Sequence, residues 1–249
     1  MAIVIRTPQE IGKMRRSGIV LRAVLDAVRA TVSVGSTTMD LERVAEAKIA
    51  ELGSVSAFKG YHGYPRVLCT SVNSEVVHGI PSKKTMLREG DVVSIDCGVV
   101  IDGYYSDSAI TVPVGKIAPE VERLLQVTEA SLANAIQTVR AGAHLGDVGA
   151  AVQEVVEAAG FSVVREFVGH GIGTSLHEDP QVPNYGRRGI GIKLREGMVI
   201  AIEPMVNIGR QDVRVLEDGW TAVTVDGSTS AHFEHTVAVT ADGAQVLTA

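Results

Sequence analysis

Two aspartates stand in a stretch of sequence that otherwise looks like an apolar hairpin. Residues 92–112 read VVSIDCGVVIDGYYSDSAITV, with Asp96 before and Asp107 after the dipeptide Asp102-Gly103. Strands usually exclude Asp, and a carboxylate on a buried sheet face is costly unless a partner neutralises it. The two acids are therefore either solvated at an exposed edge, as acidic residues mostly are, or directed at a positively charged partner.

The turn-forming dipeptide predicts how the two strands of this hairpin face each other. A two-residue loop at Asp102-Gly103 places Gly98 opposite Asp107, provided that no bulge shifts the register. Asp96 lies two residues from Gly98 and hence on the same face of the sheet. The two carboxylates then become diagonal neighbours, which repel each other unless a proton or a cation lies between them.

Three further side chains that could bind a cation stand at strands or strand ends. His170 lies in a glycine-flanked turn after an apolar run, Glu203 precedes Pro204, and Glu234 lies on the strand face opposite His235. The GxGxG spacing around His170 has no helix start after it, so a phosphate-binding loop is disfavoured. Four carboxylates and one imidazole are the donors expected of a two-metal hydrolytic site. A structural zinc site would contain more Cys and His.

Secondary-structure patterns place these residues in two similar halves. A capping box at Thr7 to Glu10 and an apolar stripe up to Val28 predict a first helix, and a second is expected from Thr38 to Leu52. Further helices are expected from about 121 to 142 and at 147–159, and strands at 66–80, 91–113, 161–168, 198–207, 212–216, 220–225 and 233–240. Two helices followed by strands, twice over, indicate α+β halves of about 1–115 and 116–249 within one catalytic domain.

Composition and charge narrow the class of protein. The chain has 249 residues, of which 45% are apolar and 21% charged, and a formal net charge of −6. These fractions are typical of a globular protein, and basic runs no longer than pairs argue against nucleic-acid binding. Two cysteines without a CxxC motif suit a reducing compartment. The start MAIVIRTPQE is unlike a secretory signal, and no stretch is apolar enough to span a membrane, so we expect a cytoplasmic protein.

Six motifs together resemble those of the methionine aminopeptidases, in their short bacterial type I form. The resemblance runs over nearly all 249 residues. It is carried by GYHGYP (60–65), VVHGIP (76–81), the SID and SD of the hairpin (94–96 and 106–107), GHGIG with HEDP (169–180), AIEPM (201–205) and FEHT (233–236). It implies an α+β pita-bread fold with pseudo-twofold symmetry, in which a curved antiparallel sheet is flanked by two pairs of helices.

The resemblance also implies a dinuclear metal centre. Its ligands would be Asp96, Asp107, His170, Glu203 and Glu234. Two divalent cations would then activate a water molecule for attack on the first peptide carbonyl of the substrate. Ligand identity alone does not distinguish Co, Mn, Fe and Zn.

Three catalytic roles follow from the same resemblance. Glu203 would accept a proton, His177 would donate to the developing oxyanion, and His78 would contact the scissile amide. The alternative for both histidines is a surface or supporting role, and His235 is expected to be structural.

An aromatic cluster predicts the substrate pocket. Phe58, Tyr61 and Tyr64 fall within seven positions, which is more often a core feature than a pocket. The resemblance places them in the pocket wall, together with Cys69, Trp220, His78 and His177. A narrow apolar pocket with sulfur–aromatic contacts suits an unbranched methionine side chain. The expected substrate is the N-terminal methionine of a nascent peptide with a small second residue.

This chain departs from the family at three positions. Relatives commonly have Cys at the position of Phe58, Phe at that of Leu176 and Gln at that of His232. The first two changes would reshape the rim of the pocket, and the third would place a titrating group near Glu234. None of them removes a predicted ligand.

Two rival functions share the predicted fold. A proline-specific aminopeptidase would use the same ligand set but usually carries an additional N-terminal domain, and the GYHGYP motif favours the methionine enzyme. A catalytically silent binding module would typically have lost ligands, whereas all five positions are filled here. A transient contact with the ribosome is plausible for an enzyme that acts on nascent chains, and we expect a monomer.

Overall fold

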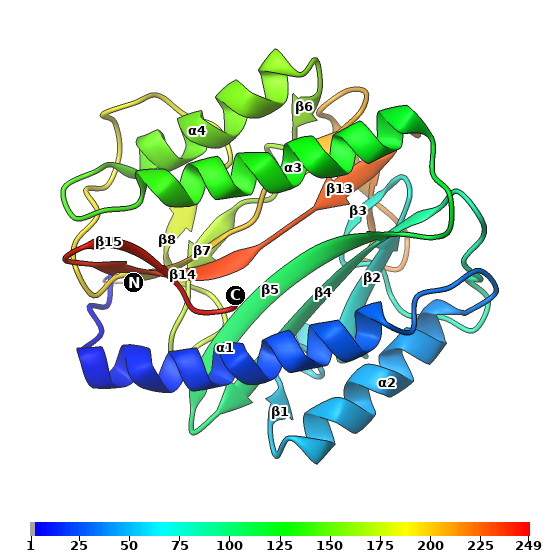
Figure 1. The fold of residues 1–249 in the computed structure, drawn as a ribbon, viewed down its shortest axis with the longest axis horizontal. Coiled ribbons are helices and arrows are strands. Elements are labelled where there is room, and N and C mark those ends of the chain that lie inside the picture. Colours follow the sequence, from blue (N-terminus) through cyan, green and yellow to red (C-terminus); the bar gives the residue numbers. More distant parts are fainter. Residues whose placement is uncertain (1–2) are drawn as a thin grey trace.

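Four α-helices and fifteen short strands make up residues 3–249, which are the residues described by the computed structural model. The first two residues of the MAIVIRTPQE segment lie outside this range. The helices form two pairs, and each pair joins a long helix to a shorter one (Figure 1). Their bounds are Pro8–Arg29 (α1), Thr38–Glu51 (α2), Pro119–Thr138 (α3) and Leu145–Ala158 (α4). All four predicted helices are confirmed.

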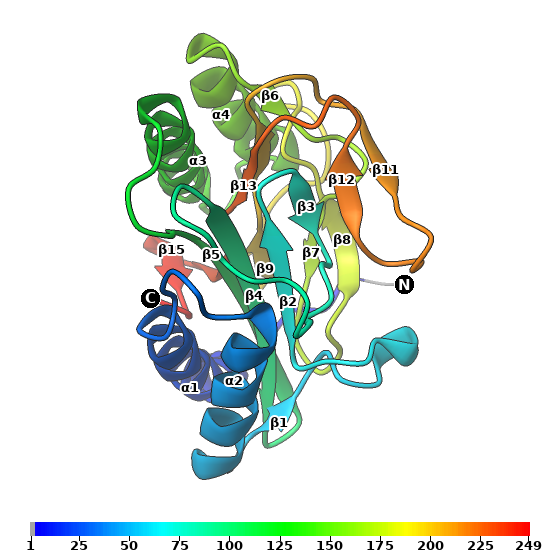
Figure 2. The ribbon, with the colours of Figure 1, turned by 90° about the vertical axis from the view of Figure 1, so that its right-hand side faces the viewer.

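The strands lie between the two helix pairs and pair only in the antiparallel sense among the described residues. Figure 2 shows the helices gathered on one side of the strands. The strands of the first half are Val55–Ser56 (β1), Leu68–Val72 (β2), Glu75–Val77 (β3), Val92–Ile101 (β4) and Tyr104–Pro113 (β5). Those of the second half are Ser162–Val163 (β6), Gly169–Gly171 (β7), Glu178–Val182 (β8), Val199–Ile202 (β9), Met205–Asn207 (β10), Val213–Val215 (β11), Ala222–Thr224 (β12), Ser230–His232 (β13), His235–Thr240 (β14) and Gly243–Val246 (β15).

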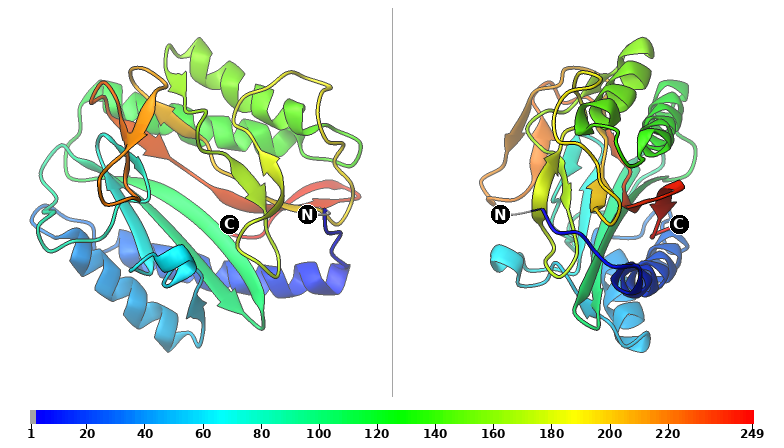
Figure 3. Two further views of the ribbon diagram at one scale, coloured as in Figure 1. Left: turned by 180° about the vertical axis from the view of Figure 1, so that it is seen from behind. Right: turned by 90° about the vertical axis from the view of Figure 1, so that its left-hand side faces the viewer.

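The two halves are joined through their sheets. One four-stranded sheet contains β1, β2, β4 and β5, and a five-stranded sheet has the order β15-β14-β9-β7-β8. A three-stranded sheet pairs β3 of the first half with β12 of the second, and another has the order β13-β10-β6. Seen from behind, the strands of both halves lie in front of the helices (Figure 3). The α+β class and the pseudo-twofold arrangement of two helix pairs are confirmed.

Each helix pair covers its own apolar core. Buried side chains of α1 and α2, such as Leu21 and Leu41, pack on the outer faces of β4 and β5, and the second half has an equivalent core under α3 and α4. The predicted capping box opens α1, because Thr7 accepts the amide of Glu10 and the Glu10 carboxylate accepts the amide of Thr7. Gly18 lies so close to the carbonyl of Leu247 that a Cβ atom would overlap it.

The β4–β5 hairpin has the predicted register. Asp102 and Gly103 both have positive φ, at 51° and 78°, as a type I′ turn requires. Gly98 pairs with Asp107, and no bulge interrupts the ladder. Asp96 therefore lies on the same face of the sheet as Asp107, as predicted.

Several details differ from the sequence-based expectation. The predicted strand at 198–207 is interrupted at Glu203 and Pro204. The predicted strand at 161–168 is reduced to Ser162–Val163. His170 lies within strand β7, not in a turn, because Gly169 and Gly171 let this strand approach neighbouring carbonyls where a Cβ atom would overlap them. The predicted strand at 233–240 begins only at His235, since the Glu234 amide leaves that strand to donate to the carbonyl of Ala109 on β5.

Candidate metal centre and substrate pocket

The five predicted ligands come from both halves and converge on one cavity. Asp96 lies on β4 and Asp107 on β5, whereas His170 lies on β7. Glu203 occupies the step between β9 and β10, and Glu234 occupies the step between β13 and β14. The cavity therefore lies where the strands of the two halves meet.

The potential ligand atoms are close enough for a shared cation. One donor atom each from Asp107, His170 and Glu234 lies within 4.8 Å of the other two. His170 Nε2 is 3.6 Å from a Glu203 oxygen and 3.8 Å from an Asp107 oxygen. Asp96 lies close enough to Asp107 for the two carboxyls to share a proton.

Neighbouring polar groups hold these side chains in place. The Nδ1 atom of His170 lies 2.9 Å from the carbonyl of Gly171, which accepts its proton and leaves Nε2 free as a ligand. The Thr236 hydroxyl donates to the Asp107 carbonyl at 2.8 Å and accepts the Asp107 amide at 3.1 Å. Thr236 thus links the two halves directly behind a predicted ligand.

Two further supporting contacts were not predicted from the sequence. The Ser108 hydroxyl donates to the carbonyl of Glu234 at 2.7 Å, and the Asn184 amide donates to the carbonyl of Glu203 at 2.9 Å. Both contacts fix the backbone at a step between two strands. No local pattern marks either residue, since each contact depends on how distant segments meet.

Burial strongly perturbs protonation in the cluster. Desolvation raises the pKa of Asp96 to about 7. Burial, and then the charges of Glu234 and Asp96, raise the pKa of Asp107 well above its usual range. Burial followed by carboxylate repulsion also raises the pKa of Glu203 and of Glu234. Desolvation lowers the pKa of His170 to about 3, so its imidazole is neutral.

The donor set fits divalent cations. Oδ1 of Asp96, Oδ1 of Asp107 and Oε1 of Glu234 are buried without any hydrogen-bond partner. Within residues 3–249, no lysine or arginine forms an ion pair with these carboxylates or with Glu203. Buried carboxylates without partners are strongly unfavourable, and hard divalent cations with oxygen and imidazole ligands would neutralise them.

An apolar pocket opens beside the cluster. It encloses about 580 Å³, counting space open to solvent. Its wall contains all of the predicted substrate-binding residues, namely Phe58, Tyr61, Tyr64, Cys69, His78, His177 and Trp220. Leu176, which sequence reasoning considered only as a departure at the rim, also lines the pocket. The aromatic cluster is therefore part of the hydrophobic core and also part of the pocket wall.

His78 and His177 contact different neighbours in the pocket wall. The ring of His78 packs edge-on against Phe167, with a centroid distance of 5.4 Å, and His78 has a positive φ of 62°. Such a backbone conformation is uncommon for a residue other than glycine and is concentrated at functional sites. The ring of His177 lies 4.2 Å from that of His170, and its Nδ1 is 2.6 Å from the Tyr61 hydroxyl.

The third departure from the family lies at the back of the cluster. His232 is buried, and its Nε2 is 3.9 Å from Glu203 and has no hydrogen-bond partner. The carboxylate that this imidazole approaches is therefore that of Glu203, whereas the sequence-based expectation was that of Glu234. Desolvation lowers the pKa of His232 to about 3. His235 faces away from the cavity and contacts the Thr248 hydroxyl at 2.9 Å.

Comparison with known proteins decides the family. Residues 12–241 match the family model of metallopeptidase family M24. The chain belongs to this family. A methionine aminopeptidase of Clostridium perfringens is 49% identical over 99% of this chain and 98% of its own length. Methionine aminopeptidase 1 of Bacillus subtilis is 47% identical over 99% of both chains.

Two solved structures are similar to this chain. The methionine aminopeptidase of Thermotoga maritima superposes with a TM-score of 0.98, at 49% identity over 99% of each chain. An Xaa-Pro dipeptidase of Bacillus anthracis superposes with a TM-score of 0.77, but it is 20% identical, and the match covers 61% of that chain. The similarity to the Xaa-Pro dipeptidase shows only that the two proteins share a fold. The predicted pita-bread fold is thereby confirmed.

Proposed function

We propose that the chain hydrolyses the first peptide bond of polypeptides that begin with methionine, and that it prefers a small second residue. The observation that carries this proposal is the cluster of four buried or half-buried carboxylates and one buried imidazole in the wall of a pocket with aromatic and apolar side chains. Full-length similarity to methionine aminopeptidases supports the same reaction. The activity is that of a metal-dependent aminopeptidase.

We infer that the cluster holds two divalent cations. Asp96, Asp107, His170, Glu203 and Glu234 would be their ligands, because four carboxylates balance the charge of two such ions. When bound, the ions polarise the scissile carbonyl and make the attacking water acidic at neutral pH. Co, Mn, Fe and Zn all suit this mixture of oxygen and nitrogen donors.

The protein's own groups then transfer the protons. Glu203 accepts the proton of the attacking water, since burial, and then the charges of Asp107 and Asp96, raise its pKa and favour its protonated form. His177 donates a hydrogen bond to the carbonyl oxygen as negative charge develops there. Burial lowers the pKa of His78 to about 4, so this imidazole is neutral and can donate its N–H to the scissile amide.

The pocket selects the side chain of the first residue. Phe58, Tyr64 and Trp220 present ring faces and edges, and buried Cys69 adds a polarisable sulfur. An unbranched thioether side chain can follow such a narrow apolar wall and gains sulfur–aromatic contacts. A β-branched or charged first residue would clash or lose its hydration, and we expect it to be rejected.

We further propose how the protein works in the cell. It acts as a cytoplasmic monomer with one catalytic domain over residues 1–249 and meets nascent chains through a transient contact with the ribosome. Direct nucleic-acid binding is not expected, because the chain carries a net charge of −6 and no long basic run. No helix within residues 3–249 is long and apolar enough to cross a membrane.

A panel of three peptides tests the reaction. The metal-supplemented protein is incubated with Met-Ala-Ser, Leu-Ala-Ser and Ala-Pro-Gly, and released amino acids are quantified. We expect methionine release from the first peptide and little or no cleavage of the others. Cleavage of Ala-Pro-Gly instead would assign the chain to proline-specific peptidases. No turnover of any peptide by the metal-loaded protein would support a silent binding module.

A further inference from the structure

A short loop between β7 and β8 carries two pocket residues. Residues 174–178 include Leu176 and His177, both of which line the substrate pocket. The carbonyl of Gly173, just before this loop, accepts the amide of Tyr105 at 2.8 Å. The position of His177 therefore depends on what fixes the rest of the loop.

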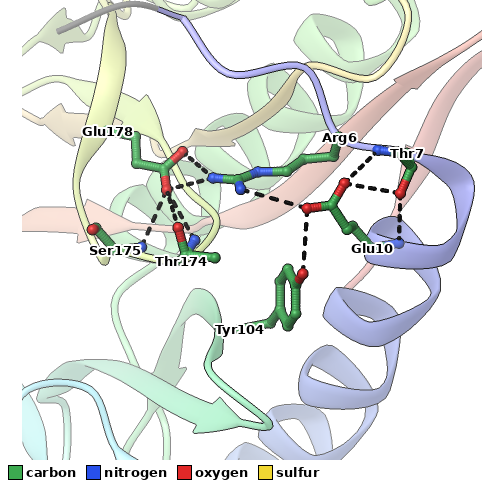
Figure 4. Close-up of polar contacts among 7 residues, drawn as sticks. All are labelled: Arg6, Thr7, Glu10, Tyr104, Thr174, Ser175 and Glu178. Atoms are coloured by element: carbon green, nitrogen blue, oxygen red, sulfur yellow. Dashed lines mark hydrogen bonds and ion pairs between the residues drawn. The ribbon is translucent and has the colours of Figure 1, made fainter.

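The carboxylate of Glu178 closes this loop on itself. Its Oε1 atom accepts the backbone amides of Thr174 at 2.9 Å and of Ser175 at 3.1 Å. The carboxylate of Glu178 thus holds the first residues of the turn to its last residue (Figure 4), and the two pocket residues lie between them in the chain. The side chain of Glu178 is only 14% exposed, so its negative charge needs a partner.

Arg6, from the segment that precedes α1, is that partner. Its Nη2 atom donates to both Glu178 oxygens, at 2.5 and 2.6 Å, and its side chain is 6% exposed. A Cβ atom at Gly173 would overlap the guanidinium group, so the arginine lies directly against the start of the loop. The Arg6 amide also donates to the carbonyl of Gly197 at 2.7 Å, which anchors the arginine backbone.

The start of α1 supports the arginine from its other side. Nη1 of Arg6 lies 3.9 Å from the Glu10 carboxylate, which also accepts the Thr7 amide and the Tyr104 hydroxyl (Figure 4). Glu10 thus belongs both to the helix cap and to the contacts of Arg6. These contacts connect the N-terminal segment, the tip of the β4–β5 hairpin and the loop that carries His177.

We propose that Arg6 is a positioning residue for His177. It neutralises Glu178 and thereby keeps the turn at 174–178 closed, so that the His177 ring stays beside His170. This role rests on the proposed function, in which His177 donates to the substrate carbonyl. Without Arg6, the buried carboxylate would draw in water or turn outward, and the amides of Thr174 and Ser175 would lose their acceptor.

Steady-state kinetics on Met-Ala-Ser tests the role of Arg6. Because misplacing one catalytic donor lowers turnover strongly, Arg6→Met should lower kcat by about 10- to 100-fold and change KM by less than about threefold. Arg6→Lys should recover kcat to within about threefold of wild type, since a single nitrogen makes both contacts with Glu178. Arg16→Met is the matched control, because Arg16 forms an exposed ion pair with Asp102, and it should leave kcat unchanged.

A double substitution separates positioning from general stability. In a His177→Ala background, Arg6→Met should change kcat by less than about twofold, because coupled residues do not contribute additively. An equal loss of kcat in both backgrounds would overturn the proposal, and so would wild-type kcat in Arg6→Met. If Arg6→Met does not fold, Arg6→Met/Glu178→Gln removes the unpaired charge and is measured in its place.

Hydrogen exchange gives a readout that does not depend on catalysis. The amides of Thr174 and Ser175 should exchange faster in Arg6→Met than in wild type, whereas their exchange in Arg16→Met should be unchanged. Unchanged protection in Arg6→Met would contradict the proposal even if kcat fell. If wild-type protein cleaved no methionine peptide, the proposed function would fail, and the exchange data would still show whether Arg6 holds the loop.

Discussion

The hydroxyl oxygen of Tyr61 lies 2.6 Å from Nδ1 of His177, although the two residues are 116 positions apart in the chain. Burial raises the pKa of Tyr61 and lowers that of His177. At neutral pH both groups are therefore uncharged. With the tyrosine hydroxyl as donor, the imidazole carries its proton on Nε2, the atom that the proposed mechanism requires as donor to the substrate.

Tyr61→Phe should weaken catalysis more than binding. The ring stays in the pocket wall while the hydrogen bond that selects the imidazole tautomer is lost. A bond of this kind contributes about 1 kcal/mol, which corresponds to a fall in kcat of about fivefold. Steady-state kinetics on Met-Ala-Ser measures this fall in kcat. Tyr185→Phe is the matched control far from the pocket, and a purely KM-based defect in Tyr61→Phe would contradict the tautomer role.

Asp107→Asn should abolish tight metal binding. The amide keeps the size of the side chain but removes a negative charge at the centre of the cluster. Loss of a supporting contact typically costs 10- to 100-fold in metal affinity, so loss of a ligand should cost more than about 100-fold. Isothermal titration with Mn²⁺ gives the affinity. Asp102→Asn, at the exposed turn of the same hairpin, should bind metal like wild type; equal affinities in both variants would exclude Asp107 as a ligand.

The stability of the metal-free protein should fall as pH rises. The pKa of Asp96 is raised to about 7 in the fold, above its ordinary value near 4. Its protonated form therefore stabilises the fold fully below about pH 4, and this contribution is lost as pH rises through about 7. Urea unfolding with EDTA should show a lower midpoint at about pH 8 than at about pH 6. Mn²⁺ should reverse this trend, because metal binding requires deprotonated carboxylates.

A substitution of Asp96 tests whether its carboxyl contributes to this pH dependence of stability. Asp96→Asn removes one of the titrating carboxyls and should reduce the pH dependence of the metal-free midpoint. Asp226→Asn is the control, because hydrogen bonds lower the pKa of this exposed carboxylate to about 2. An unchanged slope in Asp96→Asn would mean that other groups determine the behaviour.

Phe58→Ala should relax the choice of the first residue. Phe58 is 7% exposed and packs against Gly98, where a Cβ atom would meet its ring. Truncation enlarges the pocket, and the ratio of kcat/KM for Leu-Ala-Ser to that for Met-Ala-Ser should rise about tenfold. Phe161→Ala is the control. Phe161 is equally buried but lies in the second core, so both variants should lose about 3–5 kcal/mol of stability and only one should change specificity.

Patterns among residues close together in the sequence predicted the hairpin part of the site. The Asp102-Gly103 turn determines the register of its hairpin, and alternation along the strands then brings Asp96 and Asp107 to one face. Both steps depend only on neighbours in the sequence, so they could be derived without knowledge of the fold. The helix cap at Thr7 is similarly local.

The remaining predicted ligands could not be placed together by spacing alone. Residue type and strand context grouped His170, Glu203 and Glu234 with the hairpin acids as candidate donors, and the family resemblance implied the same five, but the pairings between distant strands that bring them to one cavity have no local signature. The break before His235 was missed because apolar alternation continues through it. The contact of Arg6 with Glu178 spans 172 positions and has no local signature at all.

Metal-dependent methionine release tests the central proposal most directly. Protein freed of metal with EDTA is titrated with Mn²⁺, and methionine release from Met-Ala-Ser is measured at each ratio of metal to protein. We expect no release without metal, a rise that saturates at about two equivalents, and no release by Asp107→Asn at the same ratios. Full activity of the metal-free protein, or wild-type activity of Asp107→Asn, would contradict a dinuclear centre at this cluster.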